Sequence, residues 1–224
     1  MKYLIIGGSK GIGKAIIDNL PEDSVIHNMS RSPYEGSKSV HNHKVDVLKD
    51  ELPEIEDLDA LIYCPGSINL KPINSLKIED FKSDFEINVI GAVKVIKMYH
   101  RDLKRNGGSI TLFSTVAVKT GMPFHASVAT AKAGVEGLTL SLAAELAPKV
   151  RVNCIAPTVT NTSLAGNILR NDKAKESTAQ RHPLNRFLEA EEVANYAIYL
   201  TSNHAKGITG QVVGIDAGIG SLKA

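Results

Sequence analysis

Short apolar runs alternate along the chain with longer stretches in which apolar residues recur every three or four positions. The short runs predict β-strands. They lie at residues 2–5, 25–29, 44–47, 60–64, 109–113, 150–155 and 212–215. The periodic stretches predict helices. They cover residues 12–20, 78–84, 87–105, 126–146 and 191–200.

Strands that alternate with helices build βαβ units, in which the strands run parallel and helices cover both faces of the sheet. The pattern therefore predicts an α/β fold with a doubly wound parallel sheet of about seven strands. We interpret residues 1–224 as a single domain, because no linker, low-complexity tract or internal repeat divides them. In such a sheet, ligands bind outside the carboxyl ends of the strands.

Glycines in the spacing G-x-x-x-G-x-G follow the first predicted strand, at Gly7, Gly11 and Gly13. Glycine allows a sharp turn and a close approach of the backbone to a ligand, and the N–H groups that start the next helix attract phosphate. Glycine turns also close ordinary strand-to-helix junctions. The position directly after the first strand favours a nucleotide-binding turn.

The second predicted strand ends without an acidic residue, and Arg31 and Lys10 place positive charge at its end. In doubly wound folds an acidic residue there binds the ribose 2′-OH of NAD, whereas an arginine accommodates the 2′-phosphate of NADP. The sequence therefore favours NADP(H) over NAD(H). The alternative is that both cations are merely solvated, as most surface lysines and arginines are.

The bulk composition excludes several classes of function. The net charge is only +2, and basic residues are interspersed with acidic ones, so no nucleic-acid surface is expected. No apolar run has membrane-spanning length and the first residues form a strand, not a signal peptide, so we expect a cytoplasmic protein. The cysteines Cys64 and Cys154 lie at apolar runs, where reduced thiols are the default and no metal site is expected.

Several motifs together resemble those of the classical short-chain dehydrogenases/reductases, over nearly the whole chain. The family's T-G-x-x-x-G-x-G corresponds to residues 6–13, with Ile6 in place of the threonine, and its adenine-contacting Asp-Val to Asp46-Val47. The resemblance implies a Rossmann-like fold and oxidoreductase chemistry with a nicotinamide cofactor.

Later motifs continue the resemblance with some losses. The family's N-N-A-G is reduced to its Gly66, and Asn88 takes the place of the structural and proton-relay asparagine. Pro157 heads the P-G-x-x-x-T loop beside the nicotinamide, with Thr158 in place of the glycine and Thr162 at the end. Residues 183–187, 191–194 and 208–211 are similar to the C-terminal part of bacterial β-ketoacyl carrier-protein reductases.

The resemblance implies a set of cofactor-binding residues drawn from these motifs. They are Gly7, Ser9, Lys10, Gly11, Ile12, Gly13, Arg31, Asp46, Val47, Cys64, Gly66, Asn88, Lys132, Pro157, Thr160 and Thr162.

The expected active centre departs from the family pattern. The family places Y-x-x-x-K on one helix face, where the lysine lowers the pKa of the tyrosine and also holds the nicotinamide ribose. Here Lys132 is present, but Val128 stands at the tyrosine position. The family's interval places Thr115 at the catalytic serine, preceded by Ser114; a threonine hydroxyl can still bind a carbonyl oxygen.

Valine has no proton to give, so another group would have to act as general acid or base. His125 lies three residues before Val128, and histidine is the side-chain type most used for proton transfer near neutral pH. A histidine at a helix start nevertheless more often caps the helix or faces solvent. Tyr63 and Tyr99 qualify only if the fold brings them close. We expect Thr115, Lys132 and Asn88 to form what remains of the catalytic group.

Three functional hypotheses follow. The first is an NADP(H)-dependent oxidoreductase that interconverts carbonyl and alcohol on an acyl or small carbonyl substrate. The second is a catalytically inactive subunit or NADP(H)-binding partner protein that keeps the fold. The third, a nucleotide-free scaffold, leaves the glycine spacing unexplained.

Substrate choice is expected in a variable lid at about residues 158–188. Its cations could meet an acyl-thioester phosphate or an acidic carrier, although a charged helix facing water fits the pattern better. The resemblance also implies a homotetramer or homodimer built on residues 87–105 and 126–146, or a hetero-oligomer with an active relative.

Overall fold

The computed structural model describes residues 1–222 and has a seven-stranded sheet at its centre. The strand order is β3-β2-β1-β4-β5-β6-β9, and every pairing is parallel. The strands are β1 (Lys2–Ile6), β2 (Val25–Ser30), β3 (His41–Lys44), β4 (Ala60–Tyr63), β5 (Ser109–Phe113), β6 (Arg151–Pro157) and β9 (Val212–Ile215). The predicted α/β fold with a doubly wound parallel sheet is confirmed.

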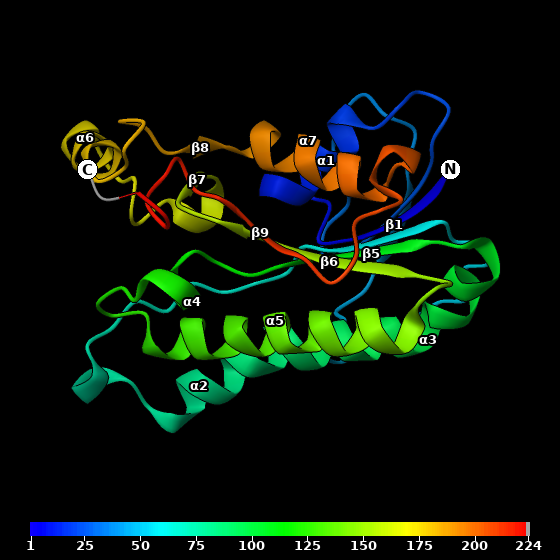
Figure 1. Ribbon diagram of the computed structural model, residues 1–224, viewed down its shortest axis with the longest axis horizontal. Coiled ribbons are helices and arrows are strands. Elements are labelled where there is room, and N and C mark those ends of the chain that lie inside the picture. The colour runs from blue at the N-terminus through cyan, green and yellow to red at the C-terminus, as the bar shows by residue number, and fades with distance from the viewer. Residues whose placement is uncertain (223–224) are drawn as a thin grey trace.

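Helices cover both faces of this sheet (Figure 1). On one face lie α1 (Gly11–Asn19) and α7 (Ala190–Thr201), which pack against each other. On the other face lie α2 (Ile78–Phe85), α3 (Gly91–Asn106) and α5 (Ala126–Leu146). Two further helices, α4 (Ala117–Thr120) and α6 (Asp172–Gln180), lie at the carboxyl ends of the strands. No helix within residues 1–222 is long and apolar enough to cross a membrane.

Alternation along the central strands sends side chains into two separate cores. In β1, Leu4 and Ile6 join the core under α3 and α5, whereas Tyr3 and Ile5 join the core under α1 and α7. Successive side chains of a strand point to opposite faces, so a strand covered on both sides is mostly apolar. This is why the central strands were readable as largely apolar runs, although β5 and β6 also bury polar residues such as Thr111 and Asn153.

The third strand differs from its predicted bounds. The apolar pattern indicated residues 44–47, but β3 is His41–Lys44, and it pairs with β2 in a register that sets His41 opposite His27. Val45 and Val47 are buried in the loop after the strand. The prediction was wrong because an apolar run reports burial, whereas this edge strand is polar and largely exposed.

Stacked histidines join β2 to this edge strand. The His27 ring lies 4.8 Å from that of His41 and 5.3 Å from that of His43, and His27 Nδ1 is 3.0 Å from His43 Nε2. Burial, followed by the neighbouring His41, His43 and Lys2, lowers the pKa of His27 to about 4. The stack is therefore favoured with His27 neutral.

We expect mild acid to weaken the fold through His27. Because its folded-state pKa lies below the unfolded value of about 6.5, the stabilisation is complete above pH 6.5 and is lost as the pH falls toward 4. The ring is partly exposed, so solvent screening limits the loss to about 1 kcal/mol. Urea unfolding at pH 7.5 and pH 5 measures it. His27→Gln should reduce the difference between the two pH values and His100→Gln should not; an equal difference in all three chains would contradict the assignment.

The predicted helix over residues 87–105 begins differently from a regular helix. A π-helical turn, Glu86–Ile90, joins the end of α2 to the start of α3. Asn88 lies within this turn and is buried. Such single π turns are frequent at functional sites, and this one places Asn88 at the carboxyl-end side of the sheet.

Candidate active site

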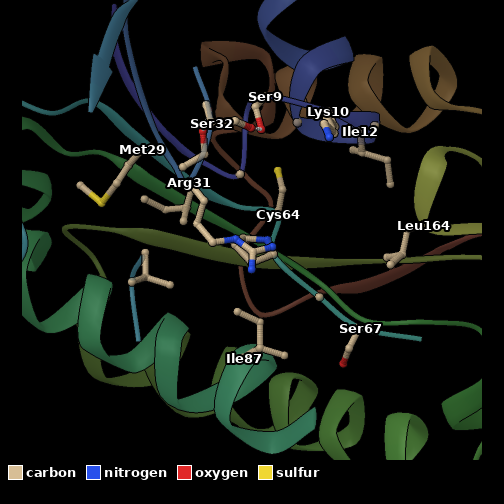
Figure 2. A pocket seen from close by; sticks show the side chains of 18 of the residues that line it. Ser9, Lys10, Ile12, Met29, Arg31, Ser32, Cys64, Ser67, Ile87 and Leu164 are labelled. Carbon is tan, nitrogen blue, oxygen red and sulfur yellow. Dashed lines mark hydrogen bonds between the residues drawn. The ribbon is translucent and has the colours of Figure 1, made fainter. Parts of the chain in front are cut away.

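A groove of about 560 Å³ lies at the carboxyl ends of β1, β2 and β4. Its walls come from the glycine turn after β1, the end of β2, the loop after β3 and the loop after β4. Figure 2 shows its side chains, with Ser9, Lys10 and Ile12 along one side and Ser67 and Ile87 along the other. This is the position where a doubly wound sheet binds its ligand.

The glycine turn brings bare backbone to the groove. Gly7 and Gly11 have φ angles of 80° and 54°, which favour glycine. A Cβ on Gly13 would lie 2.3 Å from the carbonyl oxygen of Gly7, so the helix can start here only without a side chain. The first N–H groups of α1 therefore face the groove, where they can bind a phosphate.

A positively charged corner closes the groove beside the end of β2. Arg31 reaches into the middle of the groove in Figure 2, and Lys10 lies at its rim. The hydroxyls of Ser32 and Ser9 lie between them, 3.1 Å apart. No ion pair within residues 1–222 engages either cation, so both charges are available to an anionic ligand.

A second, smaller cavity of about 160 Å³ continues from the groove. The two share Ile12, Cys64, Gly66, Ser67, Thr162 and Leu164. Much of the remaining wall is apolar, and the polar side chains that enter it include Thr115, Lys132 and Thr158. A small molecule here would contact a ligand lying in the groove.

Lys132 is the buried cation of the second cavity. Its ammonium donates a hydrogen bond of 2.8 Å to the carbonyl of Phe113. Burial lowers the pKa of Lys132 to about 8, and the nearby Cys154, Cys64 and Asp84 oppose this shift. The side chain is therefore mostly charged at pH 7 and positioned where the resemblance places a ribose.

Asn88 belongs to a buried network that the sequence did not reveal. Its amide donates to Ser67 Oγ at 3.2 Å, and Ser67 in turn donates to the carboxylate of Asp84 at 2.5 Å. Asn88 Oδ1 and Asp84 Oδ2 are buried without a partner within the described residues. Asp84 precedes Asn88 by four residues, a helical spacing that could have signalled the pair. Ser67, from the loop after β4, lines both cavities.

Gly66 separates Asn88 from Lys132. A Cβ at this position would lie 3.2 Å from both Asn88 Oδ1 and Lys132 Nζ. Both polar atoms thus converge on the glycine that remains of the family's N-N-A-G motif. A polar group could be bound between them only because no side chain fills this space.

The two adjacent hydroxyls after β5 point in different directions. Ser114 donates to Glu136 at 2.6 Å and is buried against α5. Thr115 Oγ1 accepts from the backbone N–H of Ala117 at 3.3 Å, which leaves its own proton for the cavity. This geometry favours Thr115 over Ser114 for binding a substrate oxygen.

Val128 lines the second cavity and is buried, with 5% of its surface exposed. Tyr63 donates to the carbonyl of Ile87 and Tyr99 to that of Pro53, and neither lines the cavity. The fold therefore does not bring either hydroxyl to the cavity, which was the condition for either to replace the missing tyrosine. His125 does line the cavity, with Nδ1 donating to the carbonyl of Pro123 at 2.7 Å.

The remaining expected residues are also brought together. Every expected cofactor-binding residue except Asn88 lines one of the two cavities. Pro157 and Thr160 line the smaller cavity, Asp46 and Val47 the groove, and Thr162 both.

The segment after β6 forms a lid that is closed at its base. The short strands β7 (Thr160–Asn161) and β8 (Leu188–Glu189) pair with each other, so the two ends of the lid segment lie side by side. Inside the lid, His182 is buried, with its Nε2 2.7 Å from Thr158 Oγ1 and its Nδ1 2.8 Å from the carbonyl of Thr178. This contact could not be predicted from the sequence, because it joins residues that only the folded lid brings together.

Comparison with known proteins agrees with this arrangement. Residues 41–220 match a family model described as Enoyl-(Acyl carrier protein) reductase. The 3-oxoacyl-(acyl-carrier-protein) reductase FabG of Thermotoga maritima is 29% identical over 238 residues, which cover 96% of this chain and 96% of that protein.

Solved structures are similar over their whole length. The crystal structure of a short chain dehydrogenase family protein from Francisella tularensis is 26% identical with a TM-score of 0.88, covering 99% of each chain. A tyrosine-to-phenylalanine variant of ElxO with NADPH bound is 25% identical with a TM-score of 0.86, again covering 99% of each chain. With its glycine turn, parallel sheet and lysine-bearing second cavity, the chain belongs to the classical short-chain dehydrogenase/reductase family.

Proposed function

We propose that this chain is an NADP(H)-dependent oxidoreductase that interconverts a carbonyl and an alcohol on an acyl or small carbonyl substrate. The observation that carries the proposal is the continuity of the two cavities: a groove with a phosphate-binding turn and free cations opens into a pocket that holds Lys132 and Thr115. Such an arrangement would let a small substrate in the second cavity lie against one end of a long nucleotide in the groove.

The residues of the groove fit a dinucleotide phosphate. The start of α1 would bind the pyrophosphate, Arg31 and Lys10 the 2′-phosphate, and Asp46-Val47 the adenine. Lys132 would hold the ribose nearest the second cavity. When bound, the cofactor would supply or accept the hydride. The side chains of this chain would bind the substrate, polarise its carbonyl group and transfer the proton.

These side chains can bind and polarise a carbonyl group. Thr115 donates a hydrogen bond to the carbonyl oxygen, and the charged Lys132 stabilises negative charge that develops there. Lys132 and Asn88 position a water or the ribose beside Gly66. Val128 contributes no proton, and loss of a general acid or base typically costs about 10²- to 10⁴-fold in rate.

Val128 also favours a second candidate function, that of an inactive subunit or NADP(H)-binding partner protein. The relative ElxO was solved with NADPH in a variant whose tyrosine is phenylalanine. Removing a tyrosine hydroxyl is thus compatible with cofactor binding in that protein, and we propose the same for this chain.

NADPH binding and NADPH oxidation, measured on the same preparation, test both candidates. The probes are the N-acetylcysteamine thioester of 3-oxobutanoate and 2,3-butanedione. Binding with turnover supports the oxidoreductase, and binding without turnover supports the inactive subunit. Absence of NADPH binding would contradict both candidates and leave only the hypothesis of a nucleotide-free scaffold.

We expect Arg31→Ala to weaken NADPH binding about 10- to 100-fold and to leave NADH binding within about 3-fold. An exposed charge-assisted hydrogen bond to phosphate contributes about 1.5–3 kcal/mol, and only NADPH carries the 2′-phosphate. Fluorescence titration of the two cofactors measures the ratio. Arg101→Ala, an exposed arginine on α3 outside the groove, is the matched control. An equal loss for NADH would place Arg31 elsewhere on the cofactor.

We propose that the outer face of α2, α3 and α5 binds a second copy of this chain. Large apolar side chains are exposed on these helices: Phe85 by 42%, Met98 by 39% and Leu140 by 54%. Leu140→Glu should convert the oligomer to a monomer in light scattering. Leu184→Glu, on an equally exposed leucine of the lid, should not; a monomeric wild type would contradict the proposal.

A further inference from the structure

The second cavity contains a hydroxyl that is hydrogen-bonded to a buried imidazole. Thr158 lines the cavity, and its Oγ1 lies 2.7 Å from Nε2 of His182, which itself does not line it. We propose that Thr158 and His182 form a proton relay. The relay gives a proton to the substrate oxygen in reduction and takes it back in oxidation, in place of the tyrosine that this chain lacks. This inference rests on the proposed oxidoreductase function and identifies the proton donor that this function requires.

The hydrogen bonds fix the orientation of the imidazole. The backbone carbonyl of Thr178 can only accept, so His182 Nδ1 carries a hydrogen and donates at 2.8 Å. In the neutral ring Nε2 is then an acceptor, and the Thr158 hydroxyl donates to it. Nδ1 stays bonded to the same carbonyl when the ring takes up a second proton at Nε2, so the ring can exchange that proton without rotating.

Thr158 is held rigidly at the end of β6. Its backbone N–H donates to the carbonyl of Ile215, and its own carbonyl accepts from Thr160 Oγ1. The residue is 7% exposed and His182 only 2%, so bulk water does not compete for the bond between them. Thr115, Thr158 and Val128 all line this cavity, and a substrate oxygen bound there can meet both hydroxyls.

His182 lies two residues after the end of α6, and its Nδ1 is bonded to a carbonyl of the last turn of that helix. The imidazole is therefore attached to the helix of the lid.

The proton step balances in both directions. In reduction, a bound reduced nicotinamide would supply hydride to the carbonyl carbon, and the carbonyl oxygen would take the Thr158 hydroxyl proton. Thr158 Oγ1 takes the Nε2 proton of the imidazolium, which becomes neutral and is protonated again from water. In oxidation, the alcohol proton passes to Thr158 Oγ1 while the Thr158 proton passes to His182.

The contact could instead serve only to hold the lid, and the same cavity is lined by two basic side chains, His125 and Lys132. A purely structural bond predicts that its loss weakens the enzyme whatever acid is present. Either of the other two groups as the acid predicts that the Thr158 hydroxyl is dispensable. The relay predicts that the hydroxyl is essential only while no tyrosine is present.

The test uses NADPH oxidation with the N-acetylcysteamine thioester of 3-oxobutanoate, in the wild-type chain and in a Val128→Tyr background. In the wild type, Thr158→Val should lower kcat about 10²-fold, and Thr158→Ser should stay within about 3-fold because it keeps the hydroxyl. His182→Gln, which keeps an amide for Thr158 but cannot carry the proton, should match Thr158→Val. Thr139→Val, a buried threonine of α5 outside the cavity, should leave kcat unchanged.

In the Val128→Tyr background, Thr158→Val should cost less than about 3-fold, because the tyrosine supplies the proton directly. Equal losses in both backgrounds would overturn the relay in favour of a structural bond. An unchanged kcat for Thr158→Val in the wild-type background would show that another group supplies the proton.

A readout independent of turnover is the ¹⁵N spectrum of the His182 ring in the chain without cofactor. Nε2 should be the acceptor nitrogen and should shift on Thr158→Val but not on Thr139→Val. An unresponsive ring would overturn the relay. Wild-type NADPH binding without turnover also overturns it, whereas failure to bind NADPH overturns the proposed function itself.

Discussion

Gly13→Ala should abolish NADPH binding and lower the free energy of unfolding by about 3 kcal/mol, near the upper end of the cost of overpacking. Its Cβ would lie 2.3 Å from the carbonyl oxygen of Gly7, 2.9 Å from the carbonyl carbon and 3.0 Å from Cα of Gly8. These are backbone atoms of the turn itself, so they cannot move aside as the end of a side chain does. Relief of the clash would move the start of α1 away from the groove.

Urea unfolding and NADPH titration measure the two effects separately. Gly207→Ala is the control, because a Cβ there meets no atom within 4 Å, and its stability should change by less than about 0.5 kcal/mol. Unchanged NADPH affinity in a folded Gly13→Ala chain would show that the cofactor does not rest on this turn.

Val128→Tyr should raise NADPH-dependent turnover about 10²-fold, which is the difference between a tyrosine acid that contributes about 10⁴-fold and the proposed relay, which contributes about 10²-fold. The new hydroxyl would share a helix face with Lys132, four residues later, and would enter the cavity that also holds Thr115. Lys132 has a pKa of about 8 and is mostly charged at pH 7. Its charge would stabilise a tyrosinate and so lower the pKa of the introduced tyrosine.

Val128→Phe separates the hydroxyl from the ring. It fills the same space without a proton, so it should bind NADPH as Val128→Tyr does and show no gain in turnover. Equal turnover of the two variants would mean that the added ring, not the acid, changes the rate. No gain for tyrosine with NADPH still bound would mean either that the new hydroxyl does not reach the substrate oxygen or that the donor already present is as effective; the cost of Thr158→Val in this background separates the two.

The sequence predicted those parts of the fold that are apolar and regular. The central strands are buried on both faces, so their residues had to be mostly apolar, and the amphipathic helices follow from the same requirement. The edge strand β3 was misplaced because stacked histidines, not apolar side chains, attach it to β2. The π turn at Asn88 has no sequence signal of its own.

The candidate site was predictable where it follows a motif and not where it depends on tertiary contacts. Gly13, Arg31 and Lys132 were found because each has a fixed position relative to a strand or helix. Ser67 and Asp84 were missed, since their hydrogen bond joins a loop to a helix 17 residues away. His182 was missed for the same reason: its partner Thr158 lies 24 residues earlier.

The paired strands β7 and β8 give the lid fixed ends on the sheet. A loop whose ends are already joined can change in length or composition at little cost in closure entropy. The lid is therefore a natural unit of exchange between relatives during evolution. His182 lies between β7 and β8, whereas Thr158 lies before β7. A lid exchanged at these two strands would therefore change the shape of the substrate pocket and, at the same time, one half of the proposed proton relay.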